Sequence, residues 1–266
     1  AIITGKGTRD SLLLNGDVGK IYISDSLYFP NTQLSIKAAD DHSLVSLHTS
    51  ANTTLDDALL EAEVFTMTDG VRIDFMPSSF VLNDKTWQLD KEGELLIKKN
   101  FAQATNMRFS QGFQEISIES DPDEYSNVSS LVAKIKNLNL ADIMPLFLQK
   151  PVIEGVANGE IFLRDFYGKF KVESDLKASQ FRFDNDSVGL VGIKGKYNSE
   201  NGKISFDVIS NNDKYIFSAD GFYNLKDSTG MPLQTNMKLN NTSISLLNNF
   251  LGNIFSDISG LGTGNI

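Results

Sequence analysis

The stretch IKNLNLADIMPLFLQKPVIEGVANGEI, residues 135–161, recurs in degenerate form as KLNNTSISLLNNFLGNIFSDISGLGTGNI, residues 238–266. Each copy has a strand end rich in Leu, Asn or Thr, then a short apolar helical turn, then I-x-G-x-x-x-G-x-I opening a new strand. The aligned positions are Leu140 with Ile244, Ile143 with Leu247, and, after one inserted residue, Ile153, Gly155, Gly159 and Ile161 with Ile258, Gly260, Gly264 and Ile266.

A connector that recurs after about a hundred residues predicts a stack of similar β units. We therefore expect β-meander units over residues 1–130 and a repeat unit over residues 131–266 that continues the same sheet. The second copy stops at its glycine-rich turn, so we interpret the sequence as a piece of a longer protein.

Strand signals fill the rest of the chain. Residues 16–47 alternate apolar and polar side chains, and residues 71–120 form a meander with turn residues at Pro77, Asn83-Asp84, Glu92-Gly93 and Gln111-Gly112. The alternation is clear again over residues 203–239, where one face of each strand is apolar and the other polar.

Helical signals are few. They are limited to residues 140–148 and 243–251, with a bend near residues 55–62 that follows a polar loop at residues 49–57. Strands with one apolar face must pack against another sheet, close on themselves, or curl into a trough. The predicted fold class is all-β: an elongated, curled sheet of many short antiparallel strands with one or two short helical turns.

Composition excludes several classes of protein. The formal net charge is -10, from 34 acidic and 24 basic residues, which argues against a nucleic-acid partner. No apolar run is long enough to span a bilayer. With no cysteine, disulfides, thiolate catalysis and cysteine-based zinc sites are absent.

No motif predicts catalysis, a metal or a cofactor. The two histidines, His42 and His48, lack further ligand residues nearby in the sequence, so we interpret them as surface residues of a strand. The carboxylates of residues 121–124 lack the spacing of a calcium loop, and the glycines of residues 260–264 do not fit a phosphate-binding motif. We expect a protein that is not an enzyme.

The string SSFVLNDKTWQLDKEGELLIKKNFAQATNMRFSQGFQEISIES, residues 78–120, resembles the C-terminal region of the TamB family, subunits of the translocation and assembly module. More specifically, it resembles the versions from the Bacteroidetes group. The connector LNLADIMPLFL followed by IEGVANGEI also resembles a recurring connector of that family, although the Thr-x-x-x-Pro that usually follows is missing after Gly159.

The resemblance implies an elongated periplasmic protein of a Gram-negative bacterium, anchored in the inner membrane by a segment outside this sequence. It implies a trough lined with apolar side chains, related to AsmA-like and bridge-like lipid transfer proteins. It also implies phospholipid acyl chains as cargo, an outer-membrane barrel partner, and outer-membrane protein clients. The function expected is phospholipid transport between the two membranes, outer-membrane protein assembly, or both.

The alternation also predicts which residues line the apolar groove. The predicted groove residues are Phe80, Leu82, Trp87, Leu89, Ile97, Phe109, Ile116, Ile118, Phe170, Val172, Phe181, Phe183, Ile204, Phe206, Val208, Tyr215, Phe217, Leu233, Met237 and Leu239.

Two alternative functions stay open. One is a scaffold that binds unfolded outer-membrane protein strands through its sheet edges, and the other is a secreted carbohydrate-binding β-domain.

Overall fold

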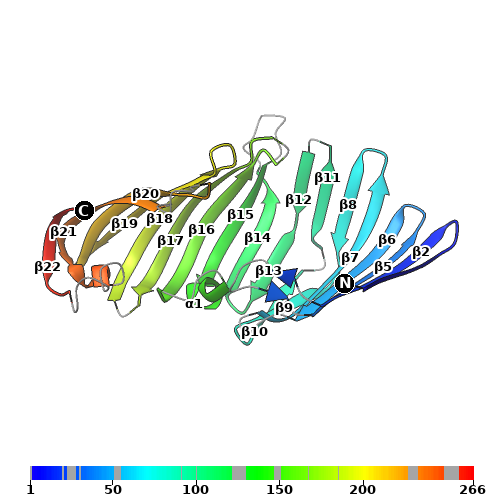
Figure 1. Cartoon of the computed structure of the whole chain (residues 1–266), viewed down its shortest axis with the longest axis horizontal. Coiled ribbons are helices and arrows are strands. Elements are labelled where there is room, and N and C mark those ends of the chain that lie inside the picture. Colours follow the sequence, from blue (N-terminus) through cyan, green and yellow to red (C-terminus); the bar gives the residue numbers. More distant parts are fainter. Residues whose placement is uncertain are drawn as a thin grey trace. The chain divides into compact units, whose positions relative to one another are not determined.

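The computed structural model confirms the all-β class, as a curled antiparallel sheet with short helical turns (Figure 1). The chain forms two compact units, and the boundary between them falls inside one strand: unit 1 is residues 1–134 with 145–149, and unit 2 is residues 135–144 with 150–266. The structure describes residues 2–19, 21–22, 28–29, 31–50, 55–90, 92–99, 101–121, 130–146, 151–166, 168–184, 186–226, 233–248 and 258–266.

Unit 1 begins with a regular antiparallel meander in which each strand pairs with the next. Its strands are β1 (Ile2–Gly7), β2 (Ser11–Val18), β5 (Asn31–Ala39), β6 (His42–Ser50) and β7 (Leu55–Met67), and a separate two-stranded ribbon consists of β3 (Ile21–Tyr22) and β4 (Tyr28–Phe29).

Strand β7 corrects two sequence expectations. The polar loop expected at residues 49–57 is shorter, because β6 continues to Ser50 and β7 begins at Leu55, and residues 51–54 lie outside the described part. The bend expected near residues 55–62 is part of β7. This segment is rich in the helix formers Ala, Leu and Glu, but pairing on both edges overrides that local preference.

The remaining strands of unit 1 are half-length pieces of longer strands. Both β8 (Gly70–Phe75) and β9 (Ser78–Leu82) pair with β7, so residues 70–82 behave as one strand interrupted at Met76 and Pro77. In the next strand, β11 (Glu94–Lys98) pairs with β8, and β10 (Lys85–Leu89) pairs with β9. In the strand after that, β12 (Phe101–Thr105) pairs with β11, and β13 (Met107–Gln111) pairs with β10. Finally, β14 (Gln114–Ser120) pairs with β13.

Only some of the expected turns are therefore hairpin turns. Asn83 and Asp84 have φ of 49° and 60°, and Gly112 has φ of 57°, as tight turns between strands require. Pro77 and Gly93 instead lie at interruptions inside the long strands, where Phe75 donates its backbone N–H to the Gly93 carbonyl at 2.8 Å.

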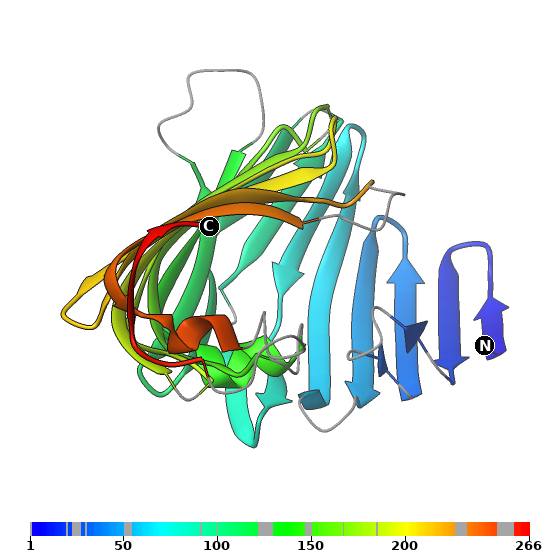
Figure 2. The same cartoon turned by 60° about the vertical axis from the view of Figure 1, so that its left-hand side comes forward.

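Unit 2 is a second antiparallel meander, from β16 to β22, that curls from strand to strand (Figure 2). Its elements are β15 (Ser130–Asn139, shared with unit 1), α1 (Leu140–Ile143), η1 (Met144–Leu146), β16 (Ile153–Arg164), β17 (Lys171–Phe183), β18 (Asp186–Asn198), β19 (Lys203–Asn212), β20 (Tyr215–Asn224), β21 (Leu233–Ser243), η2 (Ile244–Leu247) and β22 (Leu261–Asn265).

The described parts of the two connectors share several backbone features, although α1 is an α-helical turn and η2 is a 3₁₀ turn. The turns α1 and η2 begin 104 residues apart, at Leu140 and Ile244 (244 − 140 = 104). Four glycines have positive φ at equivalent places, 139° at Gly155 and 109° at Gly260, then 144° at Gly159 and 159° at Gly264. These conformations suit glycine and explain its recurrence.

A positive-φ asparagine in the strand before each turn repeats as well. Asn137 and Asn241, also 104 residues apart, have φ of 51° and 48°. The backbone N–H of Asn137 donates to Asn158 Oδ1, and that of Asn241 donates to Thr263 Oγ1, both at 2.9 Å. The repeat recognised in the sequence is thus a repeat of local structure.

Candidate apolar binding faces

In unit 2, the pairing register places apolar side chains in rows that cross the sheet. Residues directly opposite each other in antiparallel strands share a face. The first row consists of Leu163, Val172, Tyr197, Ile204, Tyr223 and Leu233. A second row on the same face consists of Leu176, Ile193, Val208, Ala219 and Met237. A third row consists of Ala157, Ala178, Val191, Ser210, Phe217 and Leu239.

The opposite face of unit 2 is polar and carries ion pairs between neighbouring strands. Lys194 lies 3.5 Å from Asp175, and Lys196 lies 3.4 Å from Glu173. These side chains are largely exposed, so the pairs contribute little to stability and serve mainly to keep this face in water. The sheet of unit 2 therefore has one apolar face and one polar face.

One end of this apolar face is closed. Leu246, carried by η2, packs against Val188 and Val191, whose exposed fractions are 1% and 0%. Tyr215 belongs to the same cluster, and Phe181, Phe183, Ile193, Val208 and Phe217 pack against it.

Asp186 fastens η2 over this closed end. Its Oδ1 accepts hydrogen bonds from the Tyr215 hydroxyl at 2.8 Å and from Ser245 Oγ at 2.5 Å. Burial, together with the hydrogen bond to the Asp186 carboxylate, raises the pKa of Tyr215 above its usual 10.0, because both disfavour the phenolate. The turn η2 is thus hydrogen-bonded to β18 through Ser245 and Asp186, which lie 59 residues apart in the chain.

The other end of the same face is open. Ile204, Tyr223 and Leu233 lie in one row and keep 37%, 41% and 49% of their surface exposed. Between the two ends Phe206 lies beside Gly221, since a Cβ at that glycine would meet the Phe206 ring at 2.9 Å. The open end offers apolar surface to a ligand.

Unit 1 has an apolar face of its own. One row across it consists of Leu12, Ala38, Ser43, Val64, Ile73, Leu95 and Ala104, and another of Leu14, Ile36, Val45, Ala62 and Phe75. On β9 and β10 the face is closed, because Leu82, Trp87 and Leu89 are between 0% and 4% exposed. Phe80 stacks on Trp87 with ring centroids 5.8 Å apart. Leu12 and Leu60 remain 45% and 38% exposed.

The structure places every predicted groove residue on the apolar face of its unit. Within unit 1 these residues are Phe80, Leu82, Trp87, Leu89, Ile97, Phe109, Ile116 and Ile118. In unit 2, Val172, Ile204, Phe206, Val208, Tyr215, Phe217, Leu233, Met237 and Leu239 follow the strand register, Phe170 contacts Tyr197 edge-on, and Phe181 and Phe183 pack on the closed cluster.

Sequence reasoning omitted members of the same faces. The largest omission is the part of unit 1 formed by β2, β5, β6 and β7. Its alternation of apolar and polar side chains was visible in the sequence and could have identified it. The omitted side chains include Leu12, Leu14, Leu34, Ile36, Val45, Leu47 and Leu60 in unit 1 and Leu176, Val191, Ile193, Tyr197 and Tyr223 in unit 2.

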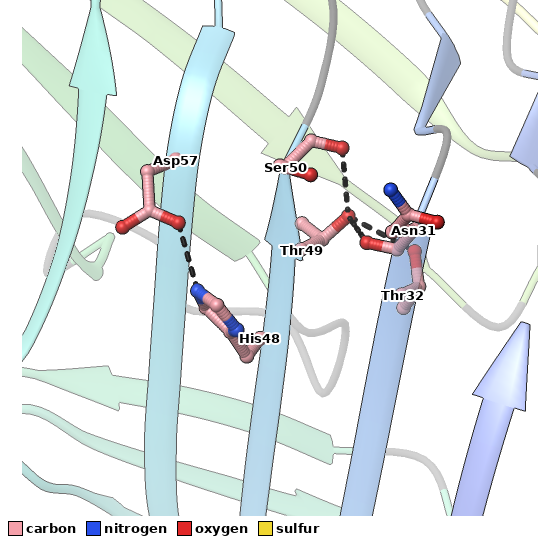
Figure 3. Close-up of polar contacts among 6 residues, drawn as sticks. All are labelled: Asn31, Thr32, His48, Thr49, Ser50 and Asp57. Carbon is pink, nitrogen blue, oxygen red and sulfur yellow. Dashed lines mark hydrogen bonds and ion pairs between the residues drawn. The ribbon is translucent and has the colours of Figure 1, made fainter. Parts of the chain in front are cut away.

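The polar contacts of unit 1 link neighbouring strands. His48 Nε2 lies 2.8 Å from Asp57 Oδ1, and both side chains are about half exposed (Figure 3). Beside them the buried hydroxyls of Thr32 and Thr49 are 2.9 Å apart and link β5 to β6. His42 stacks on Phe65, and within the described ranges no three His, Cys, Asp or Glu side chains converge as metal ligands.

Two hollows in the surface lie among polar side chains. One in unit 1, of about 320 Å³, is lined by Asp90, Arg108 and Glu119, and Arg108 Nε lies 2.6 Å from Asp90 Oδ2. One in unit 2, of about 340 Å³, is lined by Asp207, Asp220 and Asn236 on the polar face. A third hollow, of about 360 Å³ in unit 1, is lined by Ile2, Leu34 and His48 among other residues. All three are open to solvent and lack the enclosed apolar walls of a small-molecule site, so the apolar faces are the better candidates for binding.

Comparisons of the chain with protein-family models, with curated proteins and with solved structures gave no match. Within the part of the chain that the structure describes, no helix has the length and apolar character needed to cross a membrane.

Proposed function

We propose that the open parts of the apolar faces hold the acyl chains of phospholipids. The observation that carries this proposal is the open row of unit 2, in which Ile204, Tyr223 and Leu233 are exposed on the face whose other end is covered by Leu246. Each acyl CH₂ that leaves water for such a surface gains about 0.8 kcal/mol, so a few contacts along one chain give useful affinity.

The polar face of unit 2 supports the same proposal. Ion pairs such as Lys196 with Glu173 keep one side of unit 2 in water while the other side binds lipid. This division of the sheet suits a carrier that solvates acyl chains and passes them along strands, and it requires no catalytic group.

The resemblance to the TamB family supports a cellular setting for this binding. We propose that the chain is part of a TamB-like protein in the periplasm of a Gram-negative cell, working with an outer-membrane barrel partner in lipid transport between the membranes. The motifs of residues 78–120 and the connector of residues 135–161 are what support this assignment.

Photocrosslinking tests the lipid proposal directly. A photoreactive phenylalanine analogue replaces Ile204 at the open end, Phe217 at the closed end, or Lys203 on the polar face. Protein purified from cells is irradiated and analysed by mass spectrometry for attached phospholipid. We expect lipid adducts at Ile204, far fewer at Phe217, and none at Lys203. Equal labelling at Ile204 and Lys203, or no labelling at Ile204, would exclude an acyl-chain site there.

A further inference from the structure

The strand ends beside the open row of unit 2 carry positive charge. Strands β16 to β20 lie side by side (Figure 1), and at this end each of them begins or ends on the same cross-strand row. Three of the five residues in this row are cations and none is acidic, in a chain whose net charge is -10. We call the row the positive rim; it consists of Arg164, Lys171, Asn198, Lys203 and Asn224.

The positive rim directly borders the open row of the apolar face. Lys171 precedes Val172 in β17, and Lys203 precedes Ile204 in β19. Consecutive residues of a strand are about 3.3 Å apart and point to opposite faces of the sheet. Because the strands end here, the two faces meet at the rim, and apolar surface changes to cationic surface within one residue.

The cations of the rim do not lie opposite acids. Arg164 is directly opposite Lys171, and Lys203 is opposite Asn224. Like charges that face each other across two strands are unfavourable. The two lysines of the ion pairs described above, farther inside the polar face, lie opposite carboxylates instead. The rim therefore concentrates positive charge that an external anion would relieve.

Uncharged groups hold three cations at this end of the sheet. The Arg164 guanidinium lies 5.1 Å from the centre of the Phe162 ring, and the Lys203 ammonium lies 4.2 Å from that of Phe222. Lys226 donates to two backbone carbonyls of the neighbouring turn, at 3.1 and 3.2 Å. Rings and carbonyls attract a cation but carry no net charge, so these contacts position the cations without neutralising them.

One carboxylate near the rim competes with an external anion. Glu200 lies 2.7 Å from the Lys169 ammonium. The hydrogen bond from Lys169 holds the pKa of Glu200 below its usual value, and the charge of Lys171 adds to this effect. A second carboxylate, that of Asp165, accepts the backbone N–H of Lys169 at 2.7 Å. Removal of the Glu200 charge is therefore expected to make the rim more attractive to anions.

The opposite end of the same five strands is different. Its terminal residues include no cation, and η2 covers the apolar face beside them. These residues are Ile153, Phe183, Asp186, Asn212 and Tyr215. Positive charge and exposed apolar surface thus occur together at one end of the strands, as the anionic phosphodiester and the acyl chain do in a phospholipid.

We propose that the positive rim binds the phosphate of the phospholipid whose acyl chain lies on the open row. The acyl chain runs along the strands from Ile204 toward the closed end, and the phosphate lies within reach of the long side chains of Lys171 and Lys203. Ammonium and guanidinium groups form charge-assisted hydrogen bonds with phosphate oxygens. This inference rests on the proposed acyl-chain site and adds the orientation of the ligand and a preference for a phosphorylated head group.

Two single-chain lipids separate the phosphate from the acyl chain. Lauroyl lysophosphatidylglycerol and monolauroylglycerol carry the same chain, and only the first has a phosphodiester. Each is titrated below its micelle concentration into the natural protein, and binding is measured by isothermal titration calorimetry. We expect tighter binding of the phosphorylated lipid, with a preference that falls as salt is added, because exposed charges are screened. Equal affinities would overturn the phosphate site alone, whereas binding of neither lipid would overturn the acyl-chain site as well.

Charge variants test the location of the phosphate. Lys171→Gln combined with Lys203→Gln should weaken binding of the lysophosphatidylglycerol several-fold and leave that of monolauroylglycerol unchanged. Lys177→Gln combined with Lys238→Gln removes the same charge from a polar-face row away from the rim and should change neither affinity. Glu200→Gln should strengthen binding of the phosphorylated lipid. Equal losses in the two lysine pairs, or an equal loss for both lipids, would overturn the proposal.

Inorganic phosphate is the third probe. We expect it to bind far more weakly than the lysophosphatidylglycerol because it has no acyl chain. Binding of comparable strength would make the rim a site for free phosphate and contradict the proposal. The photoreactive residue that replaces Lys203 in the crosslinking experiment carries no charge, so it still reports contact of acyl chains with the polar face.

Discussion

The two ends of the apolar face in unit 2 are built from the same strands and differ in what covers them. At the closed end Leu246 of η2 packs on Val191, which is 0% exposed. At the open end of the same face, Leu233 is 49% exposed. Alternation along a strand thus determines which face is apolar, whereas a distant segment determines whether that face is core or binding surface.

The largest expected effect tests the closed end. Leu246→Ala removes a buried side chain from the cluster with Val188 and Val191 and leaves a cavity, which we expect to lower the free energy of unfolding by about 2 to 5 kcal/mol. Leu233→Ala, at the open end, should lower it by less than about 1 kcal/mol because half of that side chain is already in water. Urea unfolding measures both. Equal losses would mean that the two ends are packed alike.

The next effect concerns the attachment of η2. Asp186→Ala leaves the Tyr215 and Ser245 hydroxyls without their acceptor, and we expect a loss of about 1 to 3 kcal/mol in unfolding free energy. Asp186→Asn keeps an oxygen acceptor and should lose less. Lipid crosslinking at Phe217 should rise in the alanine variant because the closed end opens. Unchanged crosslinking there would show that η2 stays in place without this contact.

A charge at the open end should separate binding from stability. Ile204→Asp places a carboxylate on the exposed row, where we expect a change in unfolding free energy of about 1 kcal/mol or less. Co-purified phospholipid, quantified by native mass spectrometry, should fall several-fold because the acyl chain would contact a charge. Ile209→Asp is the matched control, since Ile209 is 59% exposed on the polar face. A similar loss of lipid in both variants would argue against a site at Ile204.

The smallest effect is alkaline sensitivity of the closed end. The pKa of Tyr215 is raised in the folded protein, so the stabilisation from its neutral hydroxyl is fully present below its usual pKa of 10.0 and is lost as the pH rises through the folded value. As the pH rises above 10.0 we expect the native chain to lose more unfolding free energy than Tyr215→Phe does. Identical pH profiles would mean that the hydroxyl is not linked to folding.

Much of the fold followed from local signals. The alternation of Ile204, Phe206 and Val208 predicted the apolar face, and the register of β19 with its neighbours confirms that these side chains share it. The spacing of Gly155 and Gly159 predicted the repeat, because few residues other than glycine adopt the φ that both copies require.

Other features depend on contacts between distant residues and were missed. The cover over the closed end relies on Ser245 reaching Asp186, two residues 59 positions apart, which no local pattern indicates. Pro77 and Gly93 were interpreted as hairpin turns because the same residue types serve in turns and in strand interruptions. Only the pairing partners of β8 and β9 distinguish the two cases.

The strand interruptions of unit 1 have a mechanical consequence. The breaks at Met76, Gly93 and Asn106 fall between consecutively paired strand pieces, and serine hydroxyls replace part of the hydrogen-bond ladder near them. Ser78 Oγ accepts from the Glu61 N–H at 2.9 Å, and Ser120 Oγ accepts from the Ala104 N–H at 3.1 Å. Backbone hydrogen bonds persist beside them, such as that from the Met76 N–H to the Glu61 carbonyl at 2.9 Å, so the strands stay paired. Because a rotatable hydroxyl constrains the backbone less than a continuous ladder does, we expect this part of the sheet to bend first along the line of the interruptions.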